Sequence, residues 1–151
     1  GVDFSVSAGR DLMIGRTSER NEATMRIVTR RPASLTPSEM LGTWAYHEFE
    51  IEEGAAGPTR HGFATSTRNI DFQAGCNILL NGAPAGTFTI DARRHVLLAI
   101  DGEVLDFGVT NAKDVAVSTS SEADHHVLRV LVRLESGASL RNWPVPGPSG
   151  P

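Results

Sequence analysis

The stretch that decides the fold class lies between His95 and Val109 and has the sequence His95-Val-Leu-Leu-Ala-Ile-Asp101-Gly102-Glu-Val-Leu-Asp-Phe-Gly-Val109. Two largely apolar runs flank the pair Asp101-Gly102. Asp-Gly tolerates the positive φ angles of a type I′ turn, which joins antiparallel strands through a two-residue loop. The stretch therefore predicts a β-hairpin made of residues 95–100 and 103–109.

The same pattern continues on both sides of this hairpin. Short runs in which apolar and polar residues alternate are separated by turn clusters such as Ala8-Gly9-Arg10 and Asn81-Gly82. Alternation with a period of two is typical of strands that bury one face. It predicts further strands at residues 3–7, 11–16, 24–31, 41–51, 61–72, 76–80, 86–91, 115–119 and 126–134. The protein is therefore expected to be all-β.

Composition limits the class of protein. The chain has 151 residues, 40% hydrophobic and 21% charged, which fits one soluble globular domain. A net charge of −4 gives no general attraction to nucleic acid or anionic lipid, and no stretch is apolar enough for a membrane helix. The single cysteine, Cys76, excludes an intrachain disulfide and favours a reducing, cytoplasmic compartment.

The predicted strands, a linker and a Pro- and Gly-rich tail divide the chain into four segments. Residues 1–32 hold the first strands, and residues 33–40 form a linker with one helical turn. That turn is predicted because Thr36 suits an N-cap, Pro37 the first helical position and Glu39 the third residue of a capping box. Residues 41–135 hold the remaining strands. Residues 136–151 form a Pro- and Gly-rich tail that cannot join a central strand.

An internal similarity gives residues 1–32 a second interpretation. Residues 9–15 resemble residues 102–108, and residues 25–31 resemble residues 128–134. The first strands would then be the end of a preceding repeat, and their edges could pair with another chain in a homodimer. Two unrelated hairpins can also look alike by chance, so both interpretations stay open.

A family resemblance begins at Leu41-Gly42-Thr43-Trp44-Ala45-Tyr46. This opening resembles that of the calycin group, the lipocalins and fatty-acid-binding proteins, whose first barrel strand carries Gly-x-Trp. The resemblance covers residues 40–135 and implies an antiparallel up-and-down barrel for one small ligand. It also implies that Trp44 closes one end of the barrel and that Arg129 or Arg133 packs across it. A β-sandwich is the alternative, since it gives the same alternation.

The alternation also predicts which strand faces are buried. Trp44 and Phe49 are both core candidates, yet they lie on opposite faces of their strand, so a β-bulge between them is expected. The apolar face of the last strand is expected to point inward, and it carries His126, Leu128, Val130, Val132 and Leu134.

Candidate site residues are the aromatic, histidine and acidic side chains of this region. The candidates for lining a ligand cavity are Trp44, Tyr46, Phe63, Phe88 and Phe107. The candidates for catalysis are Tyr46, His47, Glu48 and His61, because such groups can donate to a carbonyl or move a proton. Ordinary aromatic packing and a solvated strand face explain the same residues without catalysis.

No cofactor and no metal are expected. The sequence contains no Ser/His/Asp signature, phosphate loop or CxxC pair. Adjacent His125 and His126 would point to opposite faces of a strand, so they rarely reach one ion. Cys76 is interpreted as a small buried apolar residue.

Three function hypotheses remain. The first is a non-catalytic protein that holds a small apolar molecule or a short peptide in a barrel cavity. The second is a small β-barrel cyclase or isomerase of a biosynthetic pathway. The third is a structural repeat module of a larger protein. The lack of a catalytic signature favours binding.

Overall fold

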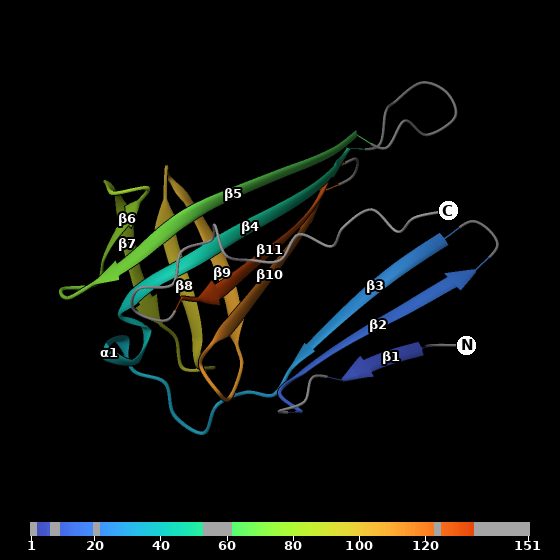
Figure 1. The fold of residues 1–151 in the computed structure, drawn as a ribbon, viewed down its shortest axis with the longest axis horizontal. Helices are drawn as coiled ribbons and strands as arrows, with labels where there is room; N and C mark the ends of the chain where they lie inside the picture. The colour runs from blue at the N-terminus through green and yellow to red at the C-terminus, as the bar shows by residue number, and fades with distance from the viewer. Residues whose placement is uncertain (1–2, 7–9, 20–21, 53–61, 123–124, 135–151) are drawn as a thin grey trace, which may run out of the picture.

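The computed structural model describes residues 3–6, 10–19, 22–52, 62–122 and 125–134 (Figure 1). Strands β1 (Asp3–Val6), β2 (Leu12–Glu19) and β3 (Glu22–Thr29) form a three-stranded sheet, and α1 (Pro37–Met40) follows. The remaining strands close into a barrel: β4 (Gly42–Glu52), β5 (Gly62–Gln73), β6 (Asn77–Leu80), β7 (Ala83–Ile90), β8 (His95–Ile100), β9 (Glu103–Val109), β10 (Val115–Glu122) and β11 (His125–Arg133).

The barrel is an antiparallel up-and-down meander. Each strand from β4 to β11 pairs with the next strand along the chain, and β11 pairs with β4 to complete the ring. This topology confirms the all-β prediction and the eight-stranded barrel, and it excludes a β-sandwich. The predicted hairpin is also confirmed, because Asp101 and Gly102 have φ angles of 51° and 84° between β8 and β9.

One end of the barrel is filled by apolar side chains. Trp44 and Phe107 are 0% exposed, and Phe88 is 1% exposed. Phe72 makes edge-to-face ring contacts with both Trp44 and Phe88, at centroid distances of 5.9 and 4.9 Å. Smaller buried residues complete this packed end: Met40, Ile70, Ile78, Val96, Leu98, Val109, Ala116 and Leu131.

The short helix α1 sits at this packed end and is held by the predicted capping residues. The Thr36 backbone N–H donates to Glu39 Oε2 at 2.8 Å, as expected for a capping box. Met40 is fully buried, and its carbonyl accepts a hydrogen bond from Trp44 Nε1 at 2.9 Å. Within the described part of the chain, no helix has the length and hydropathy that crossing a membrane requires.

The predicted β-bulge in β4 is wrong. The register of β4 runs without a shift from Gly42 opposite Phe72 to Glu52 opposite Gly62. Trp44 therefore faces inward, while Phe49 lies on the outer face. No shift is needed because the inner face of β4 turns from apolar to polar along its length, and its carboxylates have partners there. The irregularity lies instead between Ile78 and Leu79 of β6.

The predicted inner face of β11 is also wrong. Leu131 is 0% exposed and Val127 is 4% exposed, and both lie opposite inward residues of β4. Arg129 and Arg133 lie on the same face of β11 as these two residues and therefore point inward too. Arginine is accepted there because Trp44 and Glu48 on β4 provide a ring face and a carboxylate. The more apolar face of the strand points outward, and its described members are half-buried: His126, Leu128, Val130, Val132 and Leu134.

The three-stranded sheet lies beside the barrel (Figure 1). The Ala112 backbone N–H donates to Asp11 Oδ2 at 3.1 Å, and Arg94 Nη1 donates to the Pro32 carbonyl at 3.1 Å. Thr29 Oγ1 lies so close to Gly108 that a Cβ atom built there would be 3.2 Å from it. The sheet region is therefore in contact with the barrel at β9 and the β9–β10 turn, and the linker after β3 contacts the β7–β8 turn.

We expect Leu131→Ala to destabilise the barrel strongly, because Leu131 is 0% exposed within the packed end. The free energy of unfolding should fall by about 2–5 kcal/mol, as measured by urea denaturation. Val104→Ala is the control, since Val104 is 67% exposed on the same barrel. Equal losses in the two variants would contradict the packed end described above.

Candidate functional site

The inner face of β4 becomes polar beyond Trp44. Arg129 of β11 lies opposite Glu48 in the register. Arg129 Nε donates to Glu48 Oε2 at 2.9 Å and to the Tyr46 hydroxyl oxygen at 3.1 Å. The Tyr46 hydroxyl in turn donates to Glu48 Oε2 at 2.7 Å. These three side chains form the Tyr46–Glu48–Arg129 network.

Two further contacts extend the polar region across neighbouring strands. Arg129 Nη1 donates to Ser120 Oγ on β10 at 3.0 Å. Two residues further along β4, on the same face of the strand, Glu50 Oε1 pairs with His125 Nε2 of β11. The polar region therefore spans β4, β11 and β10, which are adjacent in the barrel.

Among the polar side chains, exposure increases from Tyr46 toward Glu50. Tyr46 is buried, and the Arg129 side chain is only 11% exposed. The side chains of Glu48 and Glu50 are 24% and 33% exposed. An arginine–carboxylate pair that is largely shielded from water interacts more strongly than a surface pair, but it also carries a larger desolvation cost. The network thus stands at the boundary between the apolar core and solvent.

Burial determines the protonation of Tyr46. Desolvation raises the pKa of the Tyr46 hydroxyl well above its usual range, and the hydrogen bond to Glu48 raises it further. The hydroxyl therefore keeps its proton at neutral pH. In this geometry Tyr46 is a hydrogen-bond donor to Glu48 and is not available as a base.

The structure brings together two of the predicted catalytic candidates and separates a third. Tyr46 and Glu48 are hydrogen-bonded, as described above. His47 lies on the outer face of β4, where its Nδ1 is 3.2 Å from Thr67 Oγ1. Tyr46 and His47 therefore do not meet in one site, because consecutive strand residues face opposite sides. His61 lies outside the described residues.

The aromatic candidates for ligand contact lie mainly at the packed end. Trp44, Phe88 and Phe107 are part of the fully buried core. Tyr46 is the member of the set that borders the polar region. Phe63 belongs to β5, but its side chain lies outside the described residues.

Cross-strand pairing brings in residues of the polar region that the sequence did not indicate. The sequence did not group Tyr46 with Arg129, Ser120, Glu50 or His125. Arg129 contacts both Tyr46 and Ser120, and the pair of Glu50 and His125 lies beside this network. The available signal was the alternation of Tyr46, Glu48 and Glu50 on one face, but their partners on β10 and β11 lie far away in sequence. The arginine implied by the family resemblance is Arg133, whose guanidinium carbon is 4.8 Å from the centroid of the Trp44 ring.

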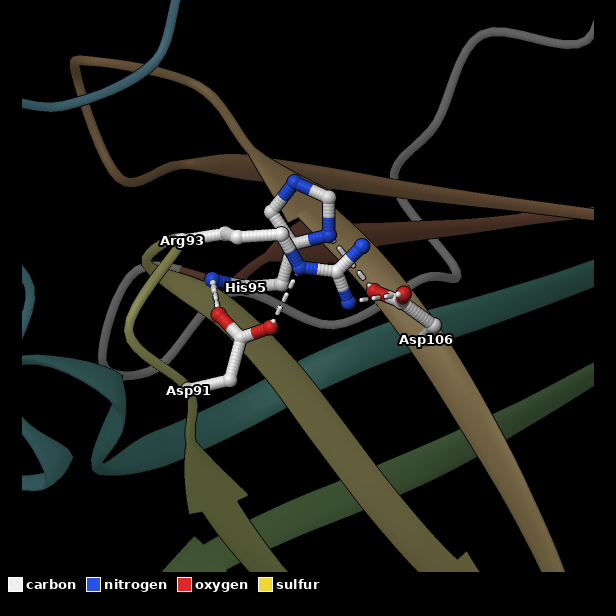
Figure 2. Close-up of polar contacts among 4 residues, drawn as sticks. All are labelled: Asp91, Arg93, His95 and Asp106. Atoms are coloured by element: carbon white, nitrogen blue, oxygen red, sulfur yellow. Dashed lines mark hydrogen bonds and ion pairs between the residues drawn. The ribbon is translucent and has the colours of Figure 1, made fainter.

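A second polar cluster lies on the outside of the barrel (Figure 2). Arg93, in the turn between β7 and β8, pairs with Asp91 at 2.7 Å and with Asp106 of β9 at 2.9 Å. His95 Nδ1 lies 2.6 Å from the other carboxylate oxygen of Asp106. The Asp91 carboxylate also accepts the His95 backbone N–H at 2.9 Å.

This outer cluster is best explained as a structural clamp. The His95 backbone N–H and the Arg93 side chain hold the pKa of Asp91 below its usual range, and Asp91 raises that of Arg93. The Arg93 side chain is 61% exposed, so its ion pairs are screened by water. The pairs link the β7–β8 turn to β9.

Among the described residues, no group of three or more His, Cys, Asp or Glu side chains is arranged so that it could hold a metal ion. His125 and His126 diverge as expected, the first toward Glu50 and the second toward Ser121 Oγ at 2.7 Å. Cys76 is half-buried in a turn with a φ of 62° and packs against the core.

No protein-family model, no curated protein and no solved structure matches this chain. Fold and site alone therefore define its class. It is an eight-stranded antiparallel up-and-down barrel, with a packed apolar end and an inward-facing charged network beside it.

The titration of Tyr46 tests the environment of the network directly, because Tyr46 is the single tyrosine of the chain. Free tyrosine ionises near pH ~10. The folded-state pKa of Tyr46 is raised above that value, so its contribution to stability is complete below pH ~10 and is lost as the pH rises further. Phenolate absorbance should therefore appear only together with alkaline unfolding.

Tyr46→Phe is the matched variant for this measurement. It removes the ionisable group, so its stability should fall less steeply on the alkaline side than that of the unaltered protein. Phenolate absorbance that rises near pH ~10 while circular dichroism still reports a folded barrel would contradict the buried hydroxyl.

Proposed function

We propose that the protein is a non-catalytic binding protein of lipocalin-like architecture. Its ligand is a small molecule with an apolar body and a polar end, such as a short peptide with its amide groups. The apolar body lies over the ring of Tyr46, and the polar end meets Glu48 and Arg129. Gly42-Thr43-Trp44 at the start of β4 and the stacking of Arg133 on Trp44 support the lipocalin-like part of the proposal.

The observation that carries the proposal is the unused hydrogen-bonding capacity of the network. Within the described part of the chain, Arg129 Nη2 has no hydrogen-bond acceptor and Glu48 Oε1 has no donor. These groups are partly shielded from water, at 11% and 24% exposure of the two side chains. Shielded polar groups gain from a partner, so a ligand that both donates and accepts hydrogen bonds fits them.

The hydrogen-bonding roles of Tyr46 and Arg129 favour binding over catalysis. The Tyr46 hydroxyl donates a hydrogen bond to Glu48 Oε2, and the pKa of this hydroxyl is raised. The Arg129 guanidinium donates hydrogen bonds and accepts none. The network can therefore orient and bind a polar group more readily than it can exchange protons with one. The pair of Glu50 and His125 is the nearest acid–base couple, and it would serve the cyclase or isomerase alternative.

Two measurements test the proposal. Native mass spectrometry of the protein purified from its natural source should reveal a retained small molecule. A titration with N-acetyl-phenylalanine amide, followed by amide NMR shifts, should saturate and perturb Tyr46, Glu48 and Arg129. Arg129→Gln should weaken binding by about tenfold or more, because a charge-assisted hydrogen bond is lost.

Arg93→Gln is the matched control, since Arg93 belongs to the outer clamp and lies outside the proposed site. Glu48→Gln provides a second site variant that keeps the shape of the side chain. No retained molecule together with no saturable titration would refute the binding function. Equal affinities for Arg129→Gln and Arg93→Gln would refute the site. Chemical conversion of the bound molecule would refute the non-catalytic function and support the enzyme alternative.

A further inference from the structure

The three-stranded sheet repeats the last three strands of the barrel in sequence. Residues 1–31 align with residues 104–134 without a gap, so that Asp3 matches Asp106 and Arg30 matches Arg133. The identical positions are Asp3, Phe4, Val6, Asp11, Ser18, Glu19, Arg26 and Arg30, whose counterparts are Asp106, Phe107, Val109, Asp114, Ser121, Glu122, Arg129 and Arg133. The alignment covers β1, β2 and β3 on one side and β9, β10 and β11 on the other.

The strand registers agree at the same offset. Val6 pairs with Met13 in the sheet, and their counterparts Val109 and Ala116 pair in the barrel. The β2–β3 register runs from Leu12 opposite Thr29 to Glu19 opposite Glu22. The β10–β11 register runs over the equivalent positions, from Val115 opposite Val132 to Glu122 opposite His125.

A hydrogen bond outside the ladders agrees as well. The Arg30 backbone N–H donates to the Asp11 carbonyl at 2.7 Å, and the Arg133 backbone N–H donates to the Asp114 carbonyl at 2.8 Å. The similarity noted between residues 9–15 and 102–108 therefore has the wrong offset. Strand β2 occupies the place of β10, between its two neighbours, and does not correspond to β9.

The two sets of strands differ in what covers their inner face. In the barrel, Leu131 and Ala116 are 0% exposed because β4–β8 close over them. Their counterparts in the sheet are Val28, which is 45% exposed, and Met13, which is half-buried. A shallow apolar depression lies on this face of the sheet, lined by Arg10, Asp11, Met13, Val28, Thr29 and Arg30.

The charges around the depression match the segment that would fill it. In the barrel, Lys113 pairs with Glu39 of α1, and Arg133 stacks on Trp44 and donates to the Glu39 carbonyl. The counterparts of these two cations in the sheet are Arg10 and Arg30, and both are exposed. The depression therefore presents the same pair of cations to a segment that carries an α1 glutamate and a β4 tryptophan.

We propose that β1–β3 are the closing strands of a second barrel. The face of the sheet that carries Met13, Val28 and Arg30 binds a second copy of the segment from α1 to β8. It does so in the way that β9–β11 bind the α1–β8 segment within the barrel. In the chain itself, α1–β8 is already closed by β9–β11. The occupant must therefore be an additional copy, as in a protein built from tandem barrels.

A direct fusion tests the proposal. Because Gly1 aligns with Val104, a second copy of residues 32–103 can be joined to Gly1 without a linker. Amide hydrogen exchange of β2 and β3 should then slow by about tenfold or more, toward the protection of β10 and β11, because the sheet becomes part of a closed barrel. Unchanged exchange in β2 and β3, or added strands that remain exposed and cause aggregation, would overturn the proposal.

A matched pair of substitutions distinguishes a specific barrel from nonspecific association. Val28 and Ile14 are 45% and 44% exposed, but Val28 corresponds to the buried Leu131, whereas Ile14 corresponds to the outward-facing Val117. In the original chain, Val28→Asp and Ile14→Asp should both leave barrel exchange unchanged. In the fusion, Val28→Asp should abolish the gained protection, while Ile14→Asp should retain it. Equal effects of the two substitutions in the fusion would overturn the proposal.

Discussion

The contact of Trp44 with Arg133 lies on the seam where the first and last strands of the barrel pair, and the pairing along this seam closes the ring. The indole N–H is held by the Met40 carbonyl of α1, and the guanidinium covers the ring at 4.8 Å. A cation over a shielded indole gains both electrostatic and packing energy. Helix, first strand and last strand are therefore fixed at one point, and the meander between them can close.

The same seam separates two kinds of interior. On one side, rings and aliphatic side chains fill the barrel around Phe72 and Phe107. On the other side, Tyr46, Glu48 and Arg129 replace them with hydrogen bonds across β4 and β11. A core that is packed on one side can support a polar network on the other, because the rigid strands hold the partners in place. This arrangement places a charged, hydrogen-bonded network directly beside an apolar core.

The sequence predicted strands and turns better than faces and partners. Asp101-Gly102 specified a hairpin locally, and Thr36 to Glu39 specified the cap of α1, since both signals act over a few residues. The inner face of β11 was mispredicted because hydrophobicity alone placed its arginines outside. Their partners belong to β4, which is adjacent only after closure. The candidate site was incomplete for the same reason.

Amide hydrogen exchange across the unaltered barrel tests the contrast between its two ends most directly. The account predicts that the slowest amides lie beside the seam, at residues such as Ala45, Leu131 and Phe72, which are at most 2% exposed. Protection should decrease along β4 and β11 toward Glu50 and His125, where the inner face is polar. Equal protection at both ends, or the slowest exchange around Glu50, would contradict a barrel that is packed around Trp44 and polar around Glu48 and Glu50.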